Sequence, residues 1–167
     1  MGLMRFYVDP AIAPAVRPGA LRAYITSFDG RVHSTKVDFE DRILSCRRLG
    51  QESGKLHIPW IVPGRGSPVV STTSLPEREQ PYILPLELAR GKLAEVREQA
   101  AAWQQLRMVI PPAYLHVQQA AFQLLAKASA SQENLDVTCR LAEESLQRSF
   151  DAADLLVRDY ILSLIHI

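Results

Sequence analysis

The stretch Pro81-Tyr-Ile-Leu-Pro-Leu-Glu-Leu-Ala-Arg-Gly-Lys-Leu-Ala-Glu-Val-Arg-Glu-Gln-Ala-Ala-Ala-Trp103 decides the fold, because the sequence changes there from strand-like to helical. Its apolar residues recur at spacings of three and four, which places them on one side of a helix: Leu86, Ala89, Leu93, Val96, Ala100 and Trp103. The charged residues are predicted to point away from that side: Glu87, Lys92, Glu95 and Glu98. An apolar side must be covered, so we expect this helix to join a β layer before it to further helices after it.

Residues 1–80 consist of short apolar runs separated by turn residues, a pattern typical of β-strands. Asp29-Gly30 lies between two such runs and predicts a hairpin, because both positions of a tight turn favour positive φ. A second turn is expected near Glu40-Asp41, which makes an antiparallel meander. The predicted strands are Leu3–Val8, Leu21–Phe28, Arg31–Phe39, Ile43–Arg48, Leu56–Val62 and Val69–Ser74. Six short strands indicate an antiparallel β-sandwich or a partly open barrel.

Prolines set two further expectations within this region. The segment 10–19 contains Pro10, Pro14 and Pro18, so we predict a loop there. Pro59 interrupts the strand Leu56–Val62 and favours an edge position or a bend for it.

The remainder of the chain is predicted to be helical. Pro111-Pro112 ends the first helix, and the three-four rhythm resumes from Tyr114 to about Ala130. After a polar turn at 131–134, a third helix places one apolar stripe on one side: Ala142, Leu146, Phe150, Ala153, Val157 and Tyr160. The last two helices form an αα-hairpin. The fold class is therefore α+β, with a β-rich domain at 1–80 and a helical connector packed on it at 81–160.

Composition and charge narrow the functional classes. The chain has 167 residues, 47% of them hydrophobic, and its 19 Lys and Arg against 18 Asp and Glu give a net charge of +1. Such a balance provides no overall field for nucleic acid or an anionic membrane, so neither is predicted as a partner. No apolar run matches a signal peptide or a membrane helix, which favours a cytoplasmic protein. Cys46 and Cys139 are expected to be buried, reduced thiols.

Motifs for catalysis or metal binding are lacking. The four histidines are widely separated and form no ligand pair, so no metal and no cofactor are predicted. No Gly-x-Ser-x-Gly motif occurs, and no catalytic residue is assigned. The pairs Glu77 with Glu79 and Asp151 with Asp154 are interpreted as solvated charges rather than as acid/base pairs. The Gly-Arg-Gly sequence around Arg65 is interpreted as a turn rather than as a phosphate loop.

Three aromatic residues are the candidates for a binding role. Trp60, Tyr82 and Tyr24 could offer flat apolar faces for stacking on sugar rings. Core packing is the favoured interpretation for Trp60, which lies between Ile58 and Ile61.

The last six residues, Leu162-Ser-Leu-Ile-His-Ile167, resemble the in-frame translation of a transposon-end adapter used in sequencing libraries. On that interpretation segment 161–167 is a tail derived from the adapter, and the biological protein continues beyond Tyr160. The alternative is an ordinary apolar helix end.

Four stretches carry a resemblance to a known family: His57–Gly64, Ser71–Tyr82, Leu84–Leu93 and Ala152–Leu156. In these stretches the chain resembles the amino-terminal region of large bacterial proteins, chiefly planctomycete, of the family-ten glycoside hydrolase-like, endo-1,4-β-xylanase type. The resemblance spans about residues 1–160. It implies that a TIM-barrel hydrolase domain with two catalytic glutamates follows, and none of those glutamates falls within this sequence.

The resemblance leads to a first hypothesis. The chain is a truncated, non-catalytic, amino-terminal accessory domain of a carbohydrate-active protein, whose partners are the downstream catalytic domain and a polysaccharide. The alternative is a protein-interaction module built on the helical hairpin, although a single hairpin without a second copy does not make a repeat array. A small independent enzyme is a third interpretation.

Overall fold

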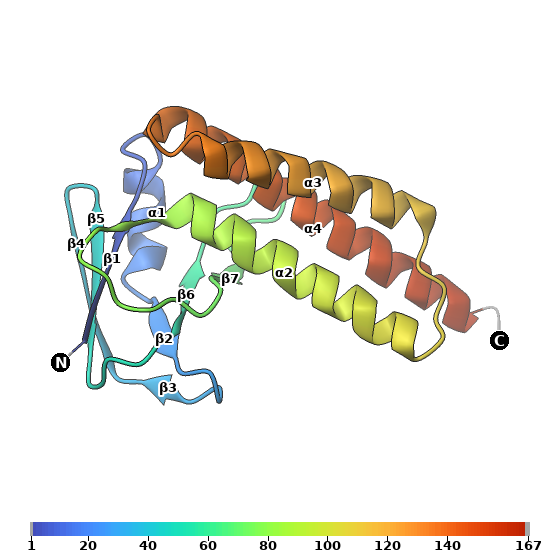
Figure 1. The fold of residues 1–167 in the computed structure, drawn as a ribbon, viewed down its shortest axis with the longest axis horizontal. Helices are drawn as coiled ribbons and strands as arrows, with labels where there is room; N and C mark the ends of the chain where they lie inside the picture. The colour runs from blue at the N-terminus through green and yellow to red at the C-terminus, as the bar shows by residue number, and fades with distance from the viewer. Residues whose placement is uncertain (1, 166–167) are drawn as a thin grey trace.

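The computed structural model describes residues 2–165 and has its strands at one end and its three long helices at the other (Figure 1). The elements in chain order are β1 (Gly2–Tyr7), α1 (Ala13–Ala20), β2 (Tyr24–Thr26), β3 (Val32–His33), β4 (Thr35–Glu40), β5 (Ile43–Arg48), β6 (Lys55–Pro59), β7 (Val69–Ser71), β8 (Tyr82–Ile83), α2 (Leu84–Gln105), α3 (Pro112–Ala130) and α4 (Leu135–Ile165). The α+β class is confirmed. The strands form two four-stranded sheets, and within residues 2–165 neither closes into a barrel.

The first sheet has the strand order β4-β5-β1-β8. β1 pairs antiparallel with β5, which places Met4 opposite Cys46 and Phe6 opposite Leu44, all four buried on the core side. β8 is parallel to β1 and was not expected, because two apolar residues that run directly into a helix show no strand period. The turn predicted at Glu40-Asp41 is present, and Asp41 takes a φ of 50° there.

The second sheet has the order β3-β2-β6-β7. The hairpin at Asp29-Gly30 is confirmed, with β2 antiparallel to β3. The prediction of one strand from Arg31 to Phe39 is wrong, because the chain changes sheets between His33 and Thr35. The Thr35 hydroxyl donates a hydrogen bond to the carbonyl of His33 (2.9 Å) and accepts one from the backbone N–H of Ile25 (3.3 Å). These two bonds connect the start of β4 to β3 and β2 at the point where the chain changes sheets.

Pro59 does not mark an edge strand. β6 lies between β2 and β7, so the predicted edge position is wrong. Pro59 is the last residue of β6, and the next backbone N–H, that of Trp60, donates to the carbonyl of Pro68 (2.9 Å). An inner strand tolerates a proline here because the missing N–H falls where the regular ladder ends.

The loop predicted at 10–19 contains a short helix instead. Asp9 prepares its start, because its carboxylate accepts a hydrogen bond from the N–H of Ala11 (2.8 Å) and its carbonyl accepts one from Ala13 (2.9 Å). Pro14 lies in the first turn of α1, where a missing N–H costs little. Buried Val16 helps α1 to pack against β4 of the first sheet and β6 of the second.

The predicted helices are present, and α3 and α4 form the expected hairpin. Asn134 caps α4, because its side-chain oxygen accepts a hydrogen bond from the N–H of Val137 (3.2 Å). Gly91 of α2 lies against the end of β7, and a Cβ there would collide with the carbonyl oxygen of Ser71. α4 continues through the predicted tail as far as Ile165, whereas His166 and Ile167 lie outside the described residues.

Two hydrophobic clusters hold the molecule together. The larger, which we call the inner core, combines side chains of both sheets and α1 with the first half of α2 and the adjoining parts of α3 and α4. The smaller, which we call the outer core, lies between the far halves of the three long helices and contains Val96, Ala100, Tyr114, Ala152 and Leu156. The predicted apolar side of α2 is confirmed, and it runs from the inner core into the outer core.

Candidate functional site

Trp60, the first sequence candidate for sugar stacking, is fully buried. Its indole Nε1–H donates to the two carboxylate oxygens of Glu143 on α4, at 3.0 and 3.3 Å. The ring therefore offers no face to a ligand in this structure, and its position agrees with the core-packing interpretation. Burial raises the pKa of Glu143 to about 7, although the Trp60 hydrogen bond acts in the opposite direction.

Tyr82 is also buried, with 5% of its surface exposed. Its hydroxyl donates to the carbonyl of Pro76 (2.7 Å), and the Arg78 guanidinium covers one ring face at 3.6 Å from the centroid. Neither face is open to a sugar.

The prediction that Glu87 points away from the core is wrong, because Glu87 is buried beside Arg90, with both carboxylate oxygens 3.1 Å from Nη1. Burial raises the pKa of Glu87, and Arg90 and Arg78 oppose that rise.

Tyr24 is the one aromatic candidate with an exposed ring, at 36% of its surface. It stacks on the imidazole of His57, with 4.8 Å between ring centroids and 6° between planes. His57 Nε2 lies 2.9 Å from the hydroxyl of Thr26, and burial lowers the pKa of His57. Across the second sheet, Tyr24 of β2 is paired with His57 of β6, and His57 is paired with Ser71 of β7. These three residues therefore form a row of two stacked rings and a hydroxyl. His57 was not among the predicted site residues, because the pairing of β2 with β6 that brings it beside Tyr24 is not visible in the sequence.

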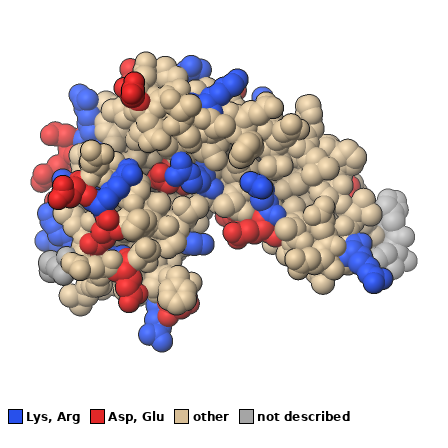
Figure 2. All heavy atoms as spheres, in the orientation of Figure 1, with Lys and Arg blue, Asp and Glu red and all other residues tan. Residues whose placement is uncertain are grey.

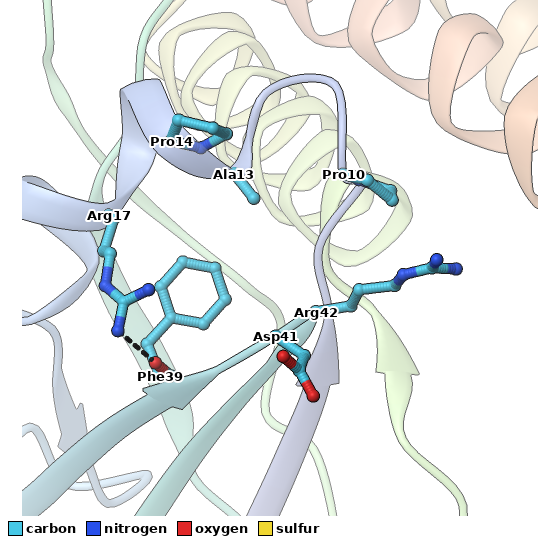
Figure 3. Close-up of a pocket in the computed structure, with 7 residues that line it drawn as sticks. All are labelled: Pro10, Ala13, Pro14, Arg17, Phe39, Asp41 and Arg42. Carbon is cyan, nitrogen blue, oxygen red and sulfur yellow. Dashed lines mark hydrogen bonds between the residues drawn. The ribbon is translucent and has the colours of Figure 1, made fainter.

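A groove of about 620 Å³ lies between α1 and the β4–β5 turn (Figure 3). Its lining includes Pro10, Pro14 and Phe39, together with the charged residues Arg17, Asp41 and Arg42. Arg17 Nη2 donates to the carbonyl of Phe39 (2.8 Å), and its guanidinium lies 5.5 Å from the centroid of that ring.

The charges of this groove do not converge. In Figure 3 the Arg42 side chain extends away from Arg17, and the Asp41 carboxylate points away from both prolines. The lining of the groove contains no cysteine, serine, histidine or lysine, and Asp41 supplies its one carboxylate.

The Gly-Arg-Gly turn joins the second sheet to α4. Gly64 and Gly66 have positive φ values of 75° and 71°, which confirms the turn. Arg65 Nη2 lies 2.6 Å from Asp151, and Nη1 pairs with Asp154. The two carboxylates are partly exposed, in agreement with the prediction of solvated charges, and one guanidinium contacts both. This fork fixes the turn on the helix, which makes its role structural.

The apolar stripe predicted on α4 is only half covered. Ala142 and Leu146 are buried in the inner core, whereas 47% of Val157 and 36% of Tyr160 are exposed. An open pocket of about 350 Å³ lies along this part of α4, lined by Ala153, Asp154, Val157, Arg158, Ile161 and Leu162. On the face shown in Figure 2, Lys, Arg, Asp and Glu gather over the strand end and become sparse toward the far end of the helices.

The remaining sequence predictions concern the two cysteines, metal binding and membrane-spanning helices. Both cysteines are buried and free, as expected. Within residues 2–165, no three His, Cys, Asp or Glu side chains gather closely enough to hold a metal ion. None of the helices in the described part of the chain is both long enough and apolar enough to cross a bilayer. Comparisons with protein-family models, with curated proteins and with solved structures return no match to this chain.

Proposed function

We propose that this chain is a non-catalytic accessory module of a carbohydrate-active protein and that it packs through α4 against a catalytic domain of the same protein. The observation that carries the proposal is the half-covered stripe of α4, in which Val157 and Tyr160 continue the apolar period past the point where the fold covers it. A periodic apolar face that reaches solvent marks an interaction surface. The family resemblance implies the identity of the partner that binds this surface, a glycoside hydrolase barrel.

The row of Tyr24, His57 and Ser71 supports the carbohydrate part of the proposal. An exposed aromatic ring can stack on the apolar face of a sugar, and neighbouring hydroxyl and imidazole groups can bond the sugar hydroxyls. Trp60 and Tyr82 are buried and have no part in this role. The second sheet would thus extend the substrate surface of the catalytic domain.

The proposed contact between α4 and a catalytic domain is tested with the protein that the complete gene encodes. Nucleotide sequence beyond codon 160 is determined from the source genome, and any barrel domain encoded there is produced separately from residues 1–160. We expect the two to bind in calorimetry and Val157→Glu to weaken binding tenfold or more (~1.4 kcal/mol), because an unpaired carboxylate would be buried.

Gln147→Glu is the matched control, because it adds the same charge to an exposed position of α4 near the inner core and should leave binding unchanged. A gene that encodes no catalytic domain would overturn the proposal, and so would a barrel that ignores the Val157 substitution.

The carbohydrate contact is tested by affinity electrophoresis on xylan and on other plant polysaccharides. Tyr24→Ala should abolish any retardation while the protein stays folded, because the ring is partly exposed. Trp60→Ala is unsuitable for this test, because it removes a buried side chain and destabilises the core. If the Tyr24→Ala variant is still retarded, the glycan does not bind at the row of Tyr24, His57 and Ser71, and this part of the proposal is wrong.

A second candidate function is a protein-interaction module, and a surface of the helical hairpin favours it. A groove of about 300 Å³ runs between α2 and α3, and its lining includes Leu115 and Phe122, which are 50% and 48% exposed. Leu115→Glu with Phe122→Glu should break a helix-dependent partner complex and leave the barrel contact intact. If Val157→Glu weakens binding to the barrel and the Leu115→Glu, Phe122→Glu variant breaks no complex, the accessory module is favoured.

A further inference from the structure

Arg48 is a buried cation without a partner. It is the last residue of β5, 2% of its surface is exposed, and neither Nε nor Nη2 has a hydrogen-bond acceptor among residues 2–165. No ion pair between residues of that range includes Arg48. The edge formed by Nε and Nη2 is the part of a guanidinium that can bind two oxygens of one anion at once. A buried charge in this state is strongly unfavourable, so Arg48 requires an anion.

The other buried side-chain atoms without a hydrogen-bond partner flank Arg48. In the described part of the chain they are Oε1 of Glu77 and Nε2 of His33. Arg48 is paired across the first sheet with Gly2 of β1, and Oε1 of Glu77 lies where a Cβ on Gly2 would be. On its other side Arg48 is paired with Thr35 of β4, two residues after His33. The unpartnered atoms therefore belong to one region, next to the point where the chain changes sheets.

The guanidinium of Arg48 lies between the two sheets. A Cβ on Gly54 would lie 2.8 Å from Nη1 of Arg48 and 2.7 Å from Cγ2 of Ile25, so the side chain reaches from β5 toward β2. Ile25 is paired with His33, which brings the imidazole to the neighbouring strand β3. The segment that ends at Gly54 borders this region, and its residues 49–53 are exposed. A small ligand would reach the guanidinium by displacing that segment.

We propose that Arg48, Glu77 and His33 form a binding site for a small oxyanion that carries a proton, of the hydrogen phosphate class. Nε and Nη2 of Arg48 donate to two of its oxygens, and the carboxylate of Glu77 accepts a hydrogen bond from its O–H group. His33 donates to a further oxygen in the tautomer that has its proton on Nε2. Water would satisfy the same hydrogen bonds but would leave the charge of Arg48 uncompensated.

Thermal unfolding in inorganic phosphate tests the site, with sodium chloride of equal ionic strength as the reference. Phosphate at about ten times its dissociation constant should raise the melting temperature of the wild type by about 3–6 °C. Arg48→Met replaces a buried charge with an apolar side chain, so it should keep the fold and lose this specific response. Any general salt effect of phosphate remains in that variant and is subtracted. Arg47→Met is the matched control, because Arg47 is the exposed neighbour on β5, and it should respond as the wild type does.

Sulfate tests the part assigned to Glu77. Near neutral pH phosphate keeps at least one proton and sulfate keeps none, so the wild type should bind phosphate and reject sulfate. Glu77→Gln should bind both, because its amide can donate to an unprotonated oxygen. Calorimetric titration of the wild type and Glu77→Gln with each anion measures this preference without the Arg48→Met variant. A wild type that binds no phosphate, or that binds sulfate equally well, would overturn the proposal, and so would an Arg48→Met variant with the full wild-type response.

Discussion

The inner core and the outer core are built from the same helices but differ in what surrounds them. The inner core combines side chains of both sheets and α1 with the first half of α2 and the adjoining parts of α3 and α4, and these side chains are almost completely buried. In the outer core, α2, α3 and α4 cover only one another, and the stripe on α4 emerges into solvent at Val157. An apolar period therefore predicts which side of a helix is apolar, but it does not predict how far along the helix that side is covered.

The largest expected difference between the two regions is in the free energy of unfolding. Leu146→Ala, in the inner core, should cost about 2–5 kcal/mol, because it leaves a cavity among packed neighbours. Val157→Ala, on the same stripe, should change stability by no more than about 0.5 kcal/mol, because the valine is half exposed in the isolated chain. Urea denaturation with a constant m-value measures both. Equal losses would mean that the stripe is covered along its whole length.

Much of the architecture could be predicted from local patterns. The Asp29-Gly30 hairpin, the turn at Asp41 and the helix break at Pro111-Pro112 depend on backbone preferences that neighbouring residues determine. The failures needed non-local information. The change of sheet between His33 and Thr35 depends on which strands lie beside them, and α1 follows a turn in which the Asp9 carboxylate accepts a hydrogen bond from the N–H of Ala11.

The candidate site was harder to predict than the fold. A buried Trp60 requires a hydrogen-bond acceptor, a demand that composition reveals, but its partner Glu143 lies 83 residues away on another element. Tyr24 and His57 meet only because β2 pairs with β6. Burial of Glu87 was missed because the charge pattern of α2 suits an exposed side, whereas the first half of α2 is surrounded by other elements.

A smaller effect should separate the two halves of α2. Gly91→Ala would normally stabilise a helix by about 1 kcal/mol, but here the new Cβ would meet the carbonyl of Ser71 and lie 2.8 Å from the carbonyl carbon of Thr72. We expect a net loss of about 1–3 kcal/mol, since the neighbour is backbone and cannot rotate away. Ala101→Gly, on the exposed outer half, should instead cost about 1 kcal/mol through helix propensity alone. Stabilisation by Gly91→Ala in thermal unfolding would show that α2 and β7 are not in close contact.

The smallest expected effect concerns Arg65, which joins the second sheet to α4 at the boundary between the two cores. Its partners Asp151 and Asp154 are 35% and 63% exposed, so water and salt weaken the attraction, and Arg65→Ala should cost no more than about 1 kcal/mol. Arg65→Lys keeps the charge but loses the planar fork that reaches both aspartates, so it should recover only part of that loss. The difference in stability between the wild type and the Arg65→Ala variant should shrink in salt of about 1 M, where charges separated by more than about 3 Å are screened. If salt leaves the difference unchanged, the contribution of Arg65 comes from its packing near the Phe150 ring, at 5.6 Å from the centroid, rather than from its charge.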